Sequence, residues 1–415
     1  MNSVLPLNFY RVQFAYLLFS SVTASFSLYL VWHYSSNDLS TSRLGLVLGL
    51  ASLAGFAQFV FLSFQSIHSR ERKLSLRLSV CAILAVLLPL ALGGNVPIAL
   101  LAGAIILSIC GAFVATASVA IIPQTSPKEH AVTAFSHKTA MFSFEPLLGP
   151  MLAGAVLTYF GGTGYLMGAI AFLVVILVLF SQSDFHTQSV EPTQMKAGLN
   201  GIKLLWGVRT ELWIATISAI FNFAFTPFLI LIMPLVILDN LGLGPLHVGL
   251  MQGAFAAGLF LGSSYLVRVA NLLFGSRYSI VVGGVAMSLA IMSFAVVENF
   301  IYLLGVQALA GMGLALFNVN ATKIRSLATP IQYRSMLESS FMLACMSTIP
   351  VGMWVFGTLA AYGTLNVALL FCGGCLLIAS VMVLAVPYLS SLAKMKGEVL
   401  DGAYARYYPQ LFSLK

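Results

Sequence analysis

The sequence predicts an all-α membrane protein with twelve transmembrane helices, arranged as two pseudo-symmetric bundles of six helices. Three observations predict this class: the composition, the spacing of the apolar segments, and the distribution of the basic residues. Of the 415 residues, 60% are hydrophobic and only 8% are charged, whereas an ordinary soluble domain carries about 25% charged residues. So few charges cannot cover the surface of a soluble chain of this length, which excludes a soluble enzyme, a disordered protein and a nucleic-acid-binding domain.

Apolar segments long enough to cross a bilayer recur along the whole chain. A membrane-spanning helix needs about 20 mainly apolar residues, and charged residues, Gly, Pro and Asn mark the breaks between such segments. The breaks at Gly161 and at Glu298 are short. The twelve predicted spans lie near residues 12–34, 43–65, 77–93, 97–122, 139–160, 164–182, 211–238, 246–267, 279–297, 300–321, 336–361 and 365–388.

The basic residues assign the two sides of the membrane. If the segment before the first span is cytoplasmic, 19 of the 20 Lys and Arg residues fall on cytoplasmic segments, and only Arg43 falls outside. Cytoplasmic loops of membrane proteins are enriched in Lys and Arg, and a missed span would destroy this alternation. The distribution therefore predicts that both termini are cytoplasmic.

The longest polar interruption between spans, residues 183–209, separates six spans from six. Two features recur across it at an offset of 203 residues: Pro127 corresponds to Pro330, and Gly149 corresponds to Gly352. Such repetition is expected of a duplicated bundle. The predicted domains are an N-terminal six-helix bundle (1–182), a cytoplasmic linker (183–209), a C-terminal six-helix bundle (210–390) and a cytoplasmic tail (391–415).

The fifth predicted span carries the most specific motif, Gly149-Pro150 followed by Gly154. Glycines permit close helix packing, and a proline frees a backbone carbonyl and bends the helix. With the six-plus-six arrangement and a basic loop after the second span, this motif resembles the major facilitator superfamily. The segment from Asn222 to Pro234 and the Gly-rich eighth span are similar to its macrolide-efflux and enterobactin-exporter-like branch of drug:proton antiporters. The resemblance implies the major facilitator fold and a packing role for Gly149, Pro150 and Gly154.

The loop after the second span departs from that family. The family pattern is Gly-x-x-x-Asp-Arg-x-Gly-Arg-Arg, but Phe64, His68 and Ser69 occupy its Gly, Asp and first Arg positions here. The basic end of the pattern survives at Arg72 and Lys73. The departure leaves open whether this chain forms the charge-based cytoplasmic latch of the family.

Ionisable residues inside predicted spans are the most useful functional signal, because an isolated charge in hydrocarbon is costly. Glu145 is the only acidic residue well inside a predicted span, about two helical turns from its cytoplasmic end, and Lys138 lies on the same helix face. The hypothesis is that Glu145 is the proton-coupling carboxylate. The alternative is a structural ion pair between Glu145 and Lys138 or another cation.

Three further charged residues lie at span ends. Glu211 begins the seventh span, Glu338 lies near the start of the eleventh, and Arg11 stands at the mouth of the first. For the two glutamates a gating or ion-pair role is favoured over proton transfer, and Lys138 is assigned the same role. Arg11 could face a carboxylate of a substrate, although anchoring of the helix is the simpler interpretation.

Polar side chains with helical spacing indicate a substrate cavity. In the first span such residues recur on one helix face, and the resembled family lines its central cavity with the first, fourth, seventh and tenth spans. The alternative is that these groups only hydrogen-bond to neighbouring helices. The predicted substrate-binding residues are Gln13, Tyr16, Ser20, Thr23, Ser27, Asn222, Thr226, Gln307 and Asn318.

No catalytic constellation is visible, so the chain is not expected to be an enzyme. The sequence contains no phosphate-binding Gly-x-x-x-x-Gly-Lys-Ser/Thr loop, which argues against ATP-driven pumping. Cys372 and Cys375 lie inside an apolar segment without a second pair or a nearby histidine, so no metal and no cofactor is expected. The expected partners are membrane lipids, a small organic substrate and protons, without nucleic acid, and the protein is expected to be a monomer.

The sequence therefore favours a proton-coupled secondary-active exporter (an antiporter) of a mid-sized organic molecule. It would work by alternating access in a bacterial-type inner membrane, with both termini cytoplasmic. Within the resembled branch a siderophore is the first substrate candidate, and efflux of drugs or antibiotics is the alternative. An importer of a nutrient or metal chelate and a non-transporting membrane sensor are the further alternatives.

Overall fold

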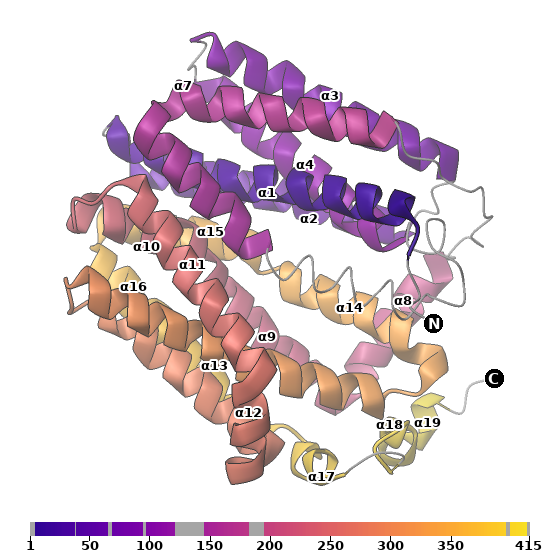
Figure 1. The fold of residues 1–415 in the computed structure, drawn as a ribbon. Coiled ribbons are helices and arrows are strands. Elements are labelled where there is room, and N and C mark those ends of the chain that lie inside the picture. Colours follow the sequence, from indigo (N-terminus) through magenta and orange to yellow (C-terminus); the bar gives the residue numbers. More distant parts are fainter. Residues whose placement is uncertain are drawn as a thin grey trace. The chain divides into compact units, whose positions relative to one another are not determined.

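The computed structural model describes residues 5–37, 39–64, 69–93, 97–120, 145–181, 195–395 and 399–412, and all regular structure in these ranges is helical (Figure 1). The first helices are α1 (Leu7–Ser36), α2 (Thr41–Phe64), α3 (Ser69–Ala91), α4 (Pro97–Ala120), α7 (Glu145–Ser181) and α8 (Met195–Gly207). The next are α9 (Arg209–Pro227), the π-helix η2 (Phe228–Ile232), α10 (Met233–Leu235), the π-helix η3 (Val236–Asn240), α11 (Pro245–Leu261), the π-helix η4 (Gly262–Leu266) and α12 (Val267–Ser293). The last are α13 (Phe300–Ala328), η5 (Ile331–Tyr333), α14 (Arg334–Met346), α15 (Ile349–Tyr362), α16 (Leu365–Met382), η6 (Val383–Ala385), α17 (Leu389–Lys394), α18 (Ala403–Tyr407) and α19 (Pro409–Phe412).

The lengths and apolar character of these helices are those of a multi-pass membrane protein. Within the described residues, nine helical stretches are long and apolar enough to cross a membrane, and the apolar helix Leu76–Ala91 is shorter. Two of the nine, Leu148–Ser181 and Pro245–Ser293, have 34 and 49 residues, which is enough for two spans each. Divided at Gly161 and Gly275, and with Leu76–Ala91 included, the helices match the twelve predicted spans.

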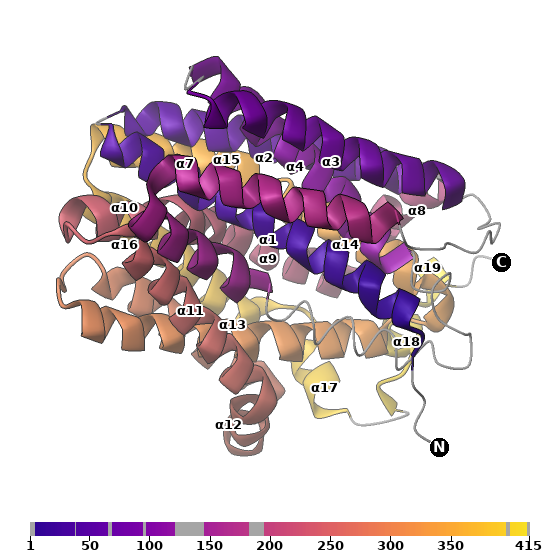
Figure 2. The ribbon, with the colours of Figure 1, turned by 45° about the horizontal axis from the view of Figure 1, so that its top comes forward.

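Gly161 and Gly275 make one-residue turns inside continuous helical stretches. Their φ angles are 66° and 75°, in the left-handed region that glycine adopts without a steric cost. A Cβ atom added at either position would contact nothing within 4 Å, so the backbone angle alone requires glycine. Figure 2 shows α7 as two arms that meet at an angle. The short break predicted at Gly161 is therefore a turn rather than a loop.

The contacts divide the chain into two compact units. Unit 1 comprises Met1–Thr193 together with Met233–Gly253, and unit 2 comprises Gln194–Ile232 together with Ala254–Lys415. Unit 1 thus contains the end of the seventh span and most of α11, in addition to the first six spans. The domain boundaries derived from the sequence stay a prediction.

Glycine contacts hold α7 in unit 1. A Cβ atom on Gly149 would lie 2.6 Å from the carbonyl oxygen of Ser21 in α1, and one on Gly154 would lie 2.5 Å from the carbonyl oxygen of Pro245. Both distances are too short for any side chain. The helix backbones therefore pack directly on one another, which is the packing that small residues allow in membrane proteins. Pro150, between the two glycines, is buried within α7.

Unit 2 repeats the Gly149 contact at the equivalent place. Pro227 lacks an N–H group and so leaves the carbonyl oxygen of Phe223 without its helical partner, and this oxygen packs against Gly352 in α15, where a Cβ atom would overlap it. The two glycines are 203 residues apart, and the two carbonyls, those of Ser21 and Phe223, are 202 residues apart. The same backbone contact in both units supports the duplicated bundle.

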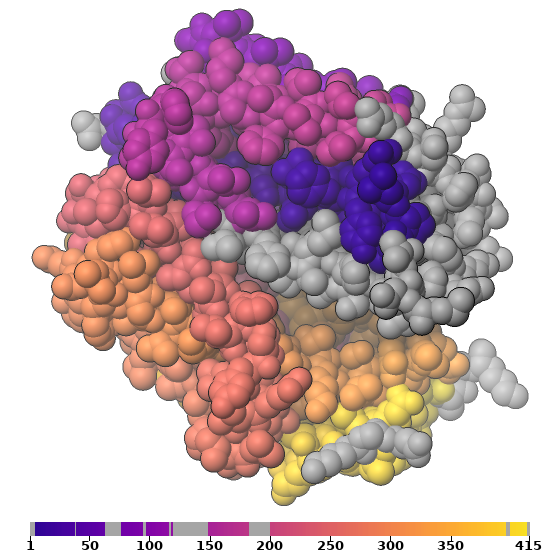
Figure 3. Space-filling view, viewed as in Figure 1, coloured from indigo at the N-terminus to yellow at the C-terminus, as the bar shows by residue number. Residues whose placement is uncertain are grey.

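The exposed face of the second arm of α7 is apolar. The second arm of α7, drawn in pink, covers part of the face shown in Figure 3. Its exposed side chains are large and apolar: Phe172, Val174, Val175 and Val178 are each more than two-fifths exposed. Exposing such an apolar stripe to water would be unfavourable, so this arm of α7 has the surface of a helix that faces lipid.

Candidate functional site

A partly buried ion-pair cluster joins three helices of unit 2. The Arg325 side chain donates from Nε to Glu211 Oε2 at 2.8 Å and from a terminal nitrogen to Glu338 Oε2 at 3.0 Å. Glu211 is fully buried, and Arg325 is 4% exposed as a residue. The Glu338 side chain is 53% exposed. Ions taken out of water are stable only when they are paired and hydrogen-bonded, and here each ion has such a partner.

Two aromatic side chains contact the charged groups of the cluster. The hydroxyl group of Tyr404 in α18 donates to Glu211 Oε1 at 2.8 Å, so both oxygens of this carboxylate accept a hydrogen bond. The guanidinium carbon of Arg325 lies 3.2 Å from the ring centroid of Phe341, within the range of a cation–π contact. We name Glu211, Arg325, Glu338 and Tyr404 the ion-pair cluster.

The local sequence places these charges where helix ends favour them. Glu211 lies in the first turn of α9, and Arg325 lies in the last turn of α13. The peptide dipoles favour an anion at the N-terminal end of a helix and a cation at the C-terminal end. Glu338 lies one turn inside α14 and four residues after Arg334. Helix dipoles and ion pairing therefore act in the same direction at Glu211 and at Arg325.

The ion-pair cluster carries more negative than positive charge. When all its members are ionised, two carboxylates face one guanidinium, so one negative charge is not compensated within the cluster. Glu211 is enclosed, whereas Glu338 is accessible. Glu338 is therefore the carboxylate of the cluster that solvent or a ligand can reach.

A cavity of about 340 Å³ adjoins the ion-pair cluster. Arg325 and Glu338 form part of its wall, and the predicted substrate residues Asn222 and Asn318 line it as well. Asn222 donates from Nδ2 to the carbonyl oxygen of Cys345 at 3.1 Å. The other lining side chains are mainly apolar and aromatic: Ser218, Phe221, Phe225, Leu314, Phe317, Ala321, Thr322, Phe341, Met342 and Cys345. Such a mixture of apolar walls and a few polar groups is typical of a ligand pocket.

A second cavity of unit 2, of about 280 Å³, shares Thr322, Arg325 and Glu338 with the first. Its other lining residues are mostly polar and include Thr329 and Arg334. The Arg325–Glu338 pair thus lies in the wall common to both cavities. Glu338 is ion-paired at this position, and the gating role expected for it stays a prediction.

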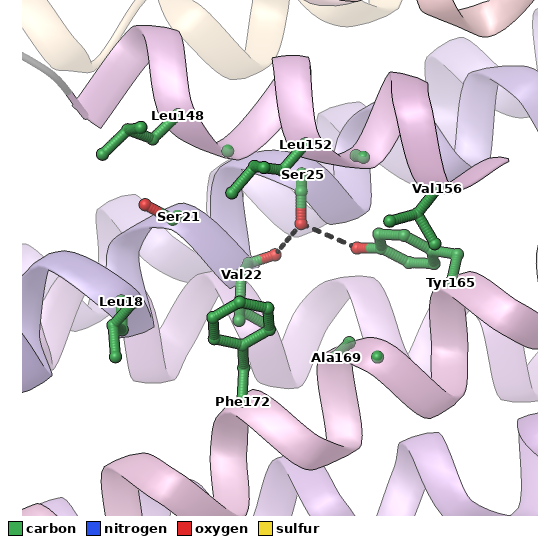
Figure 4. Close-up of a pocket in the computed structure, with 13 residues that line it drawn as sticks. Leu18, Ser21, Val22, Ser25, Leu148, Leu152, Val156, Tyr165, Ala169 and Phe172 are labelled. Atoms are coloured by element: carbon green, nitrogen blue, oxygen red, sulfur yellow. Dashed lines mark hydrogen bonds between the residues drawn. The ribbon is translucent and has the colours of Figure 1, made fainter. Parts of the chain in front are cut away.

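Unit 1 holds a different cavity, of about 90 Å³, between α1 and the two arms of α7 (Figure 4). The hydroxyl groups of Ser25 and Tyr165 lie 2.8 Å apart in its wall, and Ser25 also donates to the carbonyl oxygen of Val22. The remaining lining side chains are apolar except for Ser21. Among its lining residues there is no carboxylate, amine or guanidinium group. This cavity therefore offers apolar contacts to a ligand but no charged group that could pair with an ionic ligand.

The polar residues predicted in the first span do not line the described cavity of unit 1. Gln13 is fully buried and donates to the carbonyl oxygen of Ser118 at 3.2 Å. Tyr16 is fully buried, and its ring meets that of Phe180 edge to face. Thr23 and Ser27 donate to carbonyls three residues earlier, and Ser20 provides one of these carbonyls. Ser21 and Ser25, on the adjacent face of α1, line the cavity instead.

Other predicted residues lie apart from the cavities. Gln307 is fully buried in α13, and neither its Oε1 nor its Nε2 has a hydrogen-bond partner among the described residues. Thr226 is half-buried in α9, and Arg11 is exposed in α1. Lys138 and the side chain of Glu145 lie outside the described part of the structure, so their assigned roles stay predictions.

Two members of the ion-pair cluster, Arg325 and Tyr404, are not among the residues predicted from the sequence. The tenth span is predicted to end at residue 321, which puts Arg325 in a loop, but α13 continues to Ala328. A signal for Arg325 is present: Gln307, Gly311, Asn318 and Arg325 follow one another at intervals of four or seven residues on one helix face. Tyr404 carries no comparable signal, because nothing in its local sequence indicates burial against Glu211.

Comparison with solved structures shows the fold. The nucleoside transporter NupG is 12% identical, with 92% of this chain and 100% of that chain covered and a TM-score of 0.71. A D-xylose–proton symporter is 14% identical, with 91% and 97% covered and a TM-score of 0.68. A bacterial metal transporter is 16% identical, with 92% and 99% covered and a TM-score of 0.69.

The family follows from the sequence match. A search of curated proteins found no match. The sequence model of the Major Facilitator Superfamily matches residues 12–233, which is more than half of the chain. With its helical spans and its structural likeness to transporters, the chain therefore belongs to the major facilitator superfamily and is a membrane transporter rather than an enzyme.

Proposed function

We propose that the protein is a proton-coupled secondary-active exporter, which exchanges protons for a mid-sized organic molecule by alternating access. One observation carries the proposal. In the wall of a cavity of about 340 Å³, the half-exposed Glu338 shares a single guanidinium group with the buried Glu211. The uncompensated negative charge can be neutralised either by a proton or by a cationic or hydrogen-bond-donating group of a substrate.

Coupling follows from competition at Glu338. An ionised Glu338 keeps its pair with Arg325 and attracts a positive or donating group into the cavity. A protonated Glu338 is neutral, so it holds Arg325 more weakly and no longer attracts such a group. Because proton and substrate exclude one another, an inward proton gradient drives the substrate outward. The proposal places the protein in a bacterial-type inner membrane, as a monomer with both termini cytoplasmic.

Glu145 is a second candidate for the coupling carboxylate. It is the only acidic residue well inside a predicted span, with Lys138 on the same helix face. If Glu145→Gln leaves proton-coupled transport intact, Glu145 is not the coupling residue. If the same substitution abolishes coupling while Glu338→Gln does not, the role assigned to Glu338 passes to Glu145.

Two substrate classes are proposed. A siderophore is the first, on the resemblance of the sequence to enterobactin exporters. The cavity supports an amphipathic, cationic drug-like molecule as the second. Its walls include the stacked rings of Phe221 and Phe317, whose centroids lie 4.4 Å apart, and the adjoining ion-pair cluster has one carboxylate more than it has guanidinium groups. Aromatic faces and a surplus carboxylate both attract organic cations.

The experiment is a flux measurement in proteoliposomes with an imposed proton gradient. The probes are an iron-free catecholate siderophore and ethidium, an amphipathic aromatic cation. Proton-driven movement of either probe against the proton flow supports the exporter, and the probe that moves decides between the two substrate classes. Movement with the proton flow would show an importer, and the absence of flux with both probes would contradict export of these classes.

Glu338→Gln tests whether Glu338, in the cavity wall, is the proton-coupling carboxylate. We expect the substitution to abolish proton-driven accumulation and to weaken substrate binding, because Gln resembles the protonated carboxyl group: it cannot exchange a proton and carries no charge that attracts a cationic group. Glu298→Gln is the matched control, since Glu298 is exposed between α12 and α13, away from the ion-pair cluster. Normal proton-driven accumulation in Glu338→Gln would refute the coupling role of Glu338.

A further inference from the structure

The C-terminal segment, residues 399–412, folds onto the helix ends that carry the ion-pair cluster. The backbone N–H of Gly402 donates to the carbonyl oxygen of Leu327 at 2.9 Å. Asp401 pairs with Arg334 at 2.6 Å. These two contacts attach the segment next to the end of α13 and the start of α14.

A third attachment lies beside Glu211. The Tyr408 hydroxyl lies 2.8 Å from the Thr210 hydroxyl and accepts a hydrogen bond from the Thr210 backbone N–H at 3.1 Å. Thr210 also donates to the carbonyl oxygen of Pro387. The segment is thus held at α9, α13 and α14, the three helices that supply Glu211, Arg325 and Glu338.

Tyr404 is the residue through which the segment enters the ion-pair cluster. Its side chain is fully buried, and its hydroxyl donates to Glu211 Oε1 at 2.8 Å. Burial, followed by the neighbouring Glu211 carboxylate, raises the pKa of Tyr404 well above its ordinary value. The phenol therefore remains a protonated donor throughout the physiological pH range.

Glu211 accepts hydrogen bonds from both Tyr404 and Arg325, and this sharing determines whether Arg325 can also bind Glu338. Tyr404 satisfies one oxygen of Glu211, so Arg325 needs only Nε for the other oxygen and keeps a terminal N–H group for Glu338. Without the phenol, a fully buried carboxylate oxygen would be left without a donor, which is costly. A planar guanidinium can bind both oxygens of one carboxylate, and Arg325 would then turn toward Glu211 and release Glu338.

We propose that Tyr404 is a positioning residue, which holds Glu211 so that Arg325 pairs with Glu338, and that the C-terminal segment is therefore part of the transport machinery. This inference rests on the proposed role of Glu338 in coupling. The charged and titratable groups that face Tyr404 are Glu211 from α9, Arg325 from α13 and Tyr408 from the same segment.

The experiment measures the chemical reactivity of the Glu338 carboxyl group and needs no substrate. The full-length protein in detergent is treated with a hydrophobic carbodiimide, which modifies protonated carboxyl groups, and the modification at Glu338 is quantified by peptide mass spectrometry between pH 5 and 8. We expect slow modification while Glu338 Oε2 accepts the hydrogen bond from Arg325. In Tyr404→Phe we expect the rate at Glu338 to rise by about tenfold, the factor that the loss of one charge-assisted hydrogen bond of about 1.4 kcal/mol produces.

Two variants bracket this result. Arg325→Gln removes the guanidinium and is expected to give the fastest modification of Glu338. Tyr407→Phe is the matched control, because Tyr407 lies in the same segment and packs its ring against that of Tyr388, with the two centroids 4.6 Å apart. We expect the rate of carbodiimide modification at Glu338 in Tyr407→Phe to equal that in the protein without substitutions.

The inference fails if Tyr404→Phe leaves the reactivity of Glu338 unchanged while Arg325→Gln raises it. It also fails if Tyr407→Phe raises the reactivity as much as Tyr404→Phe, because the segment would then act only by covering the helix ends. The thermal unfolding midpoint of each variant is measured in parallel. Failure of the proposed function is separate, since it appears as normal proton-driven flux in Glu338→Gln whatever the reactivity of Glu338.

Discussion

The cavity of unit 1 and the larger cavity of unit 2 lie in helical bundles that share a repeat, but their chemistry differs. The first is lined by apolar side chains and by three hydroxyl groups, those of Ser21, Ser25 and Tyr165. The second has Arg325 and Glu338 in its wall. At the repeat offset of 203 residues, the positions equivalent to Glu211, Arg325 and Glu338 hold Asn8, Ile122 and Phe135.

This comparison separates what the fold needs from what function needs. The backbone contact of Gly149 with Ser21 recurs as that of Gly352 with Phe223, so the fold requires it in both bundles. The ion-pair cluster has no ionisable counterpart at the equivalent sequence positions, so a six-helix bundle of this family does not need it to form. A costly buried charge that the fold does not require indicates a functional role.

Arg325→Met has the largest expected effect, because it removes the charge that distinguishes the two cavities. It leaves the fully buried Glu211 without a counter-charge, and breaking a buried pair on one side typically costs about 3–5 kcal/mol. We expect a markedly lower thermal unfolding midpoint in detergent. The double variant Glu211→Gln with Arg325→Met should recover much of the loss, because it removes both charges. A double variant as unstable as the single one would show that packing of the Arg325 side chain, and not charge, is responsible.

Valine at the two repeat glycines tests whether the units share their backbone packing. In Gly149→Val and in Gly352→Val, the new side chain meets a backbone carbonyl oxygen at close range, and overpacking of this kind costs about 1–3 kcal/mol. We expect similar losses of unfolding midpoint in the two variants. Gly168→Val is the control, because a Cβ atom at Gly168 has nothing within 4 Å. A lower unfolding midpoint in only one of the two variants would show that the two glycine contacts do not contribute equally to stability.

Tyr165→Phe addresses the polar pair of unit 1 and has the smallest expected effect. The substitution removes the hydroxyl that lies 2.8 Å from Ser25, while Ser25 keeps its hydrogen bond to Val22. The loss should be about 1 kcal/mol, the net value of one neutral hydrogen bond, and proton-driven flux should persist. Loss of coupling in this variant would mean that the apolar cavity of unit 1 also takes part in proton exchange.

Much of the fold could be predicted because it depends on local patterns. The apolar segments located the spans, and the short break at Gly161 is visible in the sequence as two adjacent glycines. The predicted end of α13 lies seven residues too early, at residue 321 instead of Ala328. The charges of Lys323 and Arg325 suggest a loop there, but pairing with Glu211 and Glu338 allows a helix to carry Arg325 into a buried position.

The candidate site was predicted in part. Asn222 and Asn318, from the seventh and tenth spans, line one cavity, and their role in substrate binding stays a prediction. Glu338, predicted as a gating or ion-pair residue, lines the same cavity. The residues proposed in the first span lie instead among packed helices or hydrogen-bond to their own helix, as for Thr23 and Ser27. The period of a helix identifies which residues share a face, but it does not say which neighbour that face meets.

The sequence by itself determined the membrane class, the twelve spans and the twofold repeat, because hydropathy, charge distribution and glycine spacing act over short stretches of chain. Only the tertiary structure decided which charges meet. Arg325 lies 114 residues from Glu211, and Tyr404 lies 193 residues from it. Burial makes such pairs necessary, since an unpaired ion is too costly in the interior, but only the packing of α9, α13, α14 and α18 selects the partners.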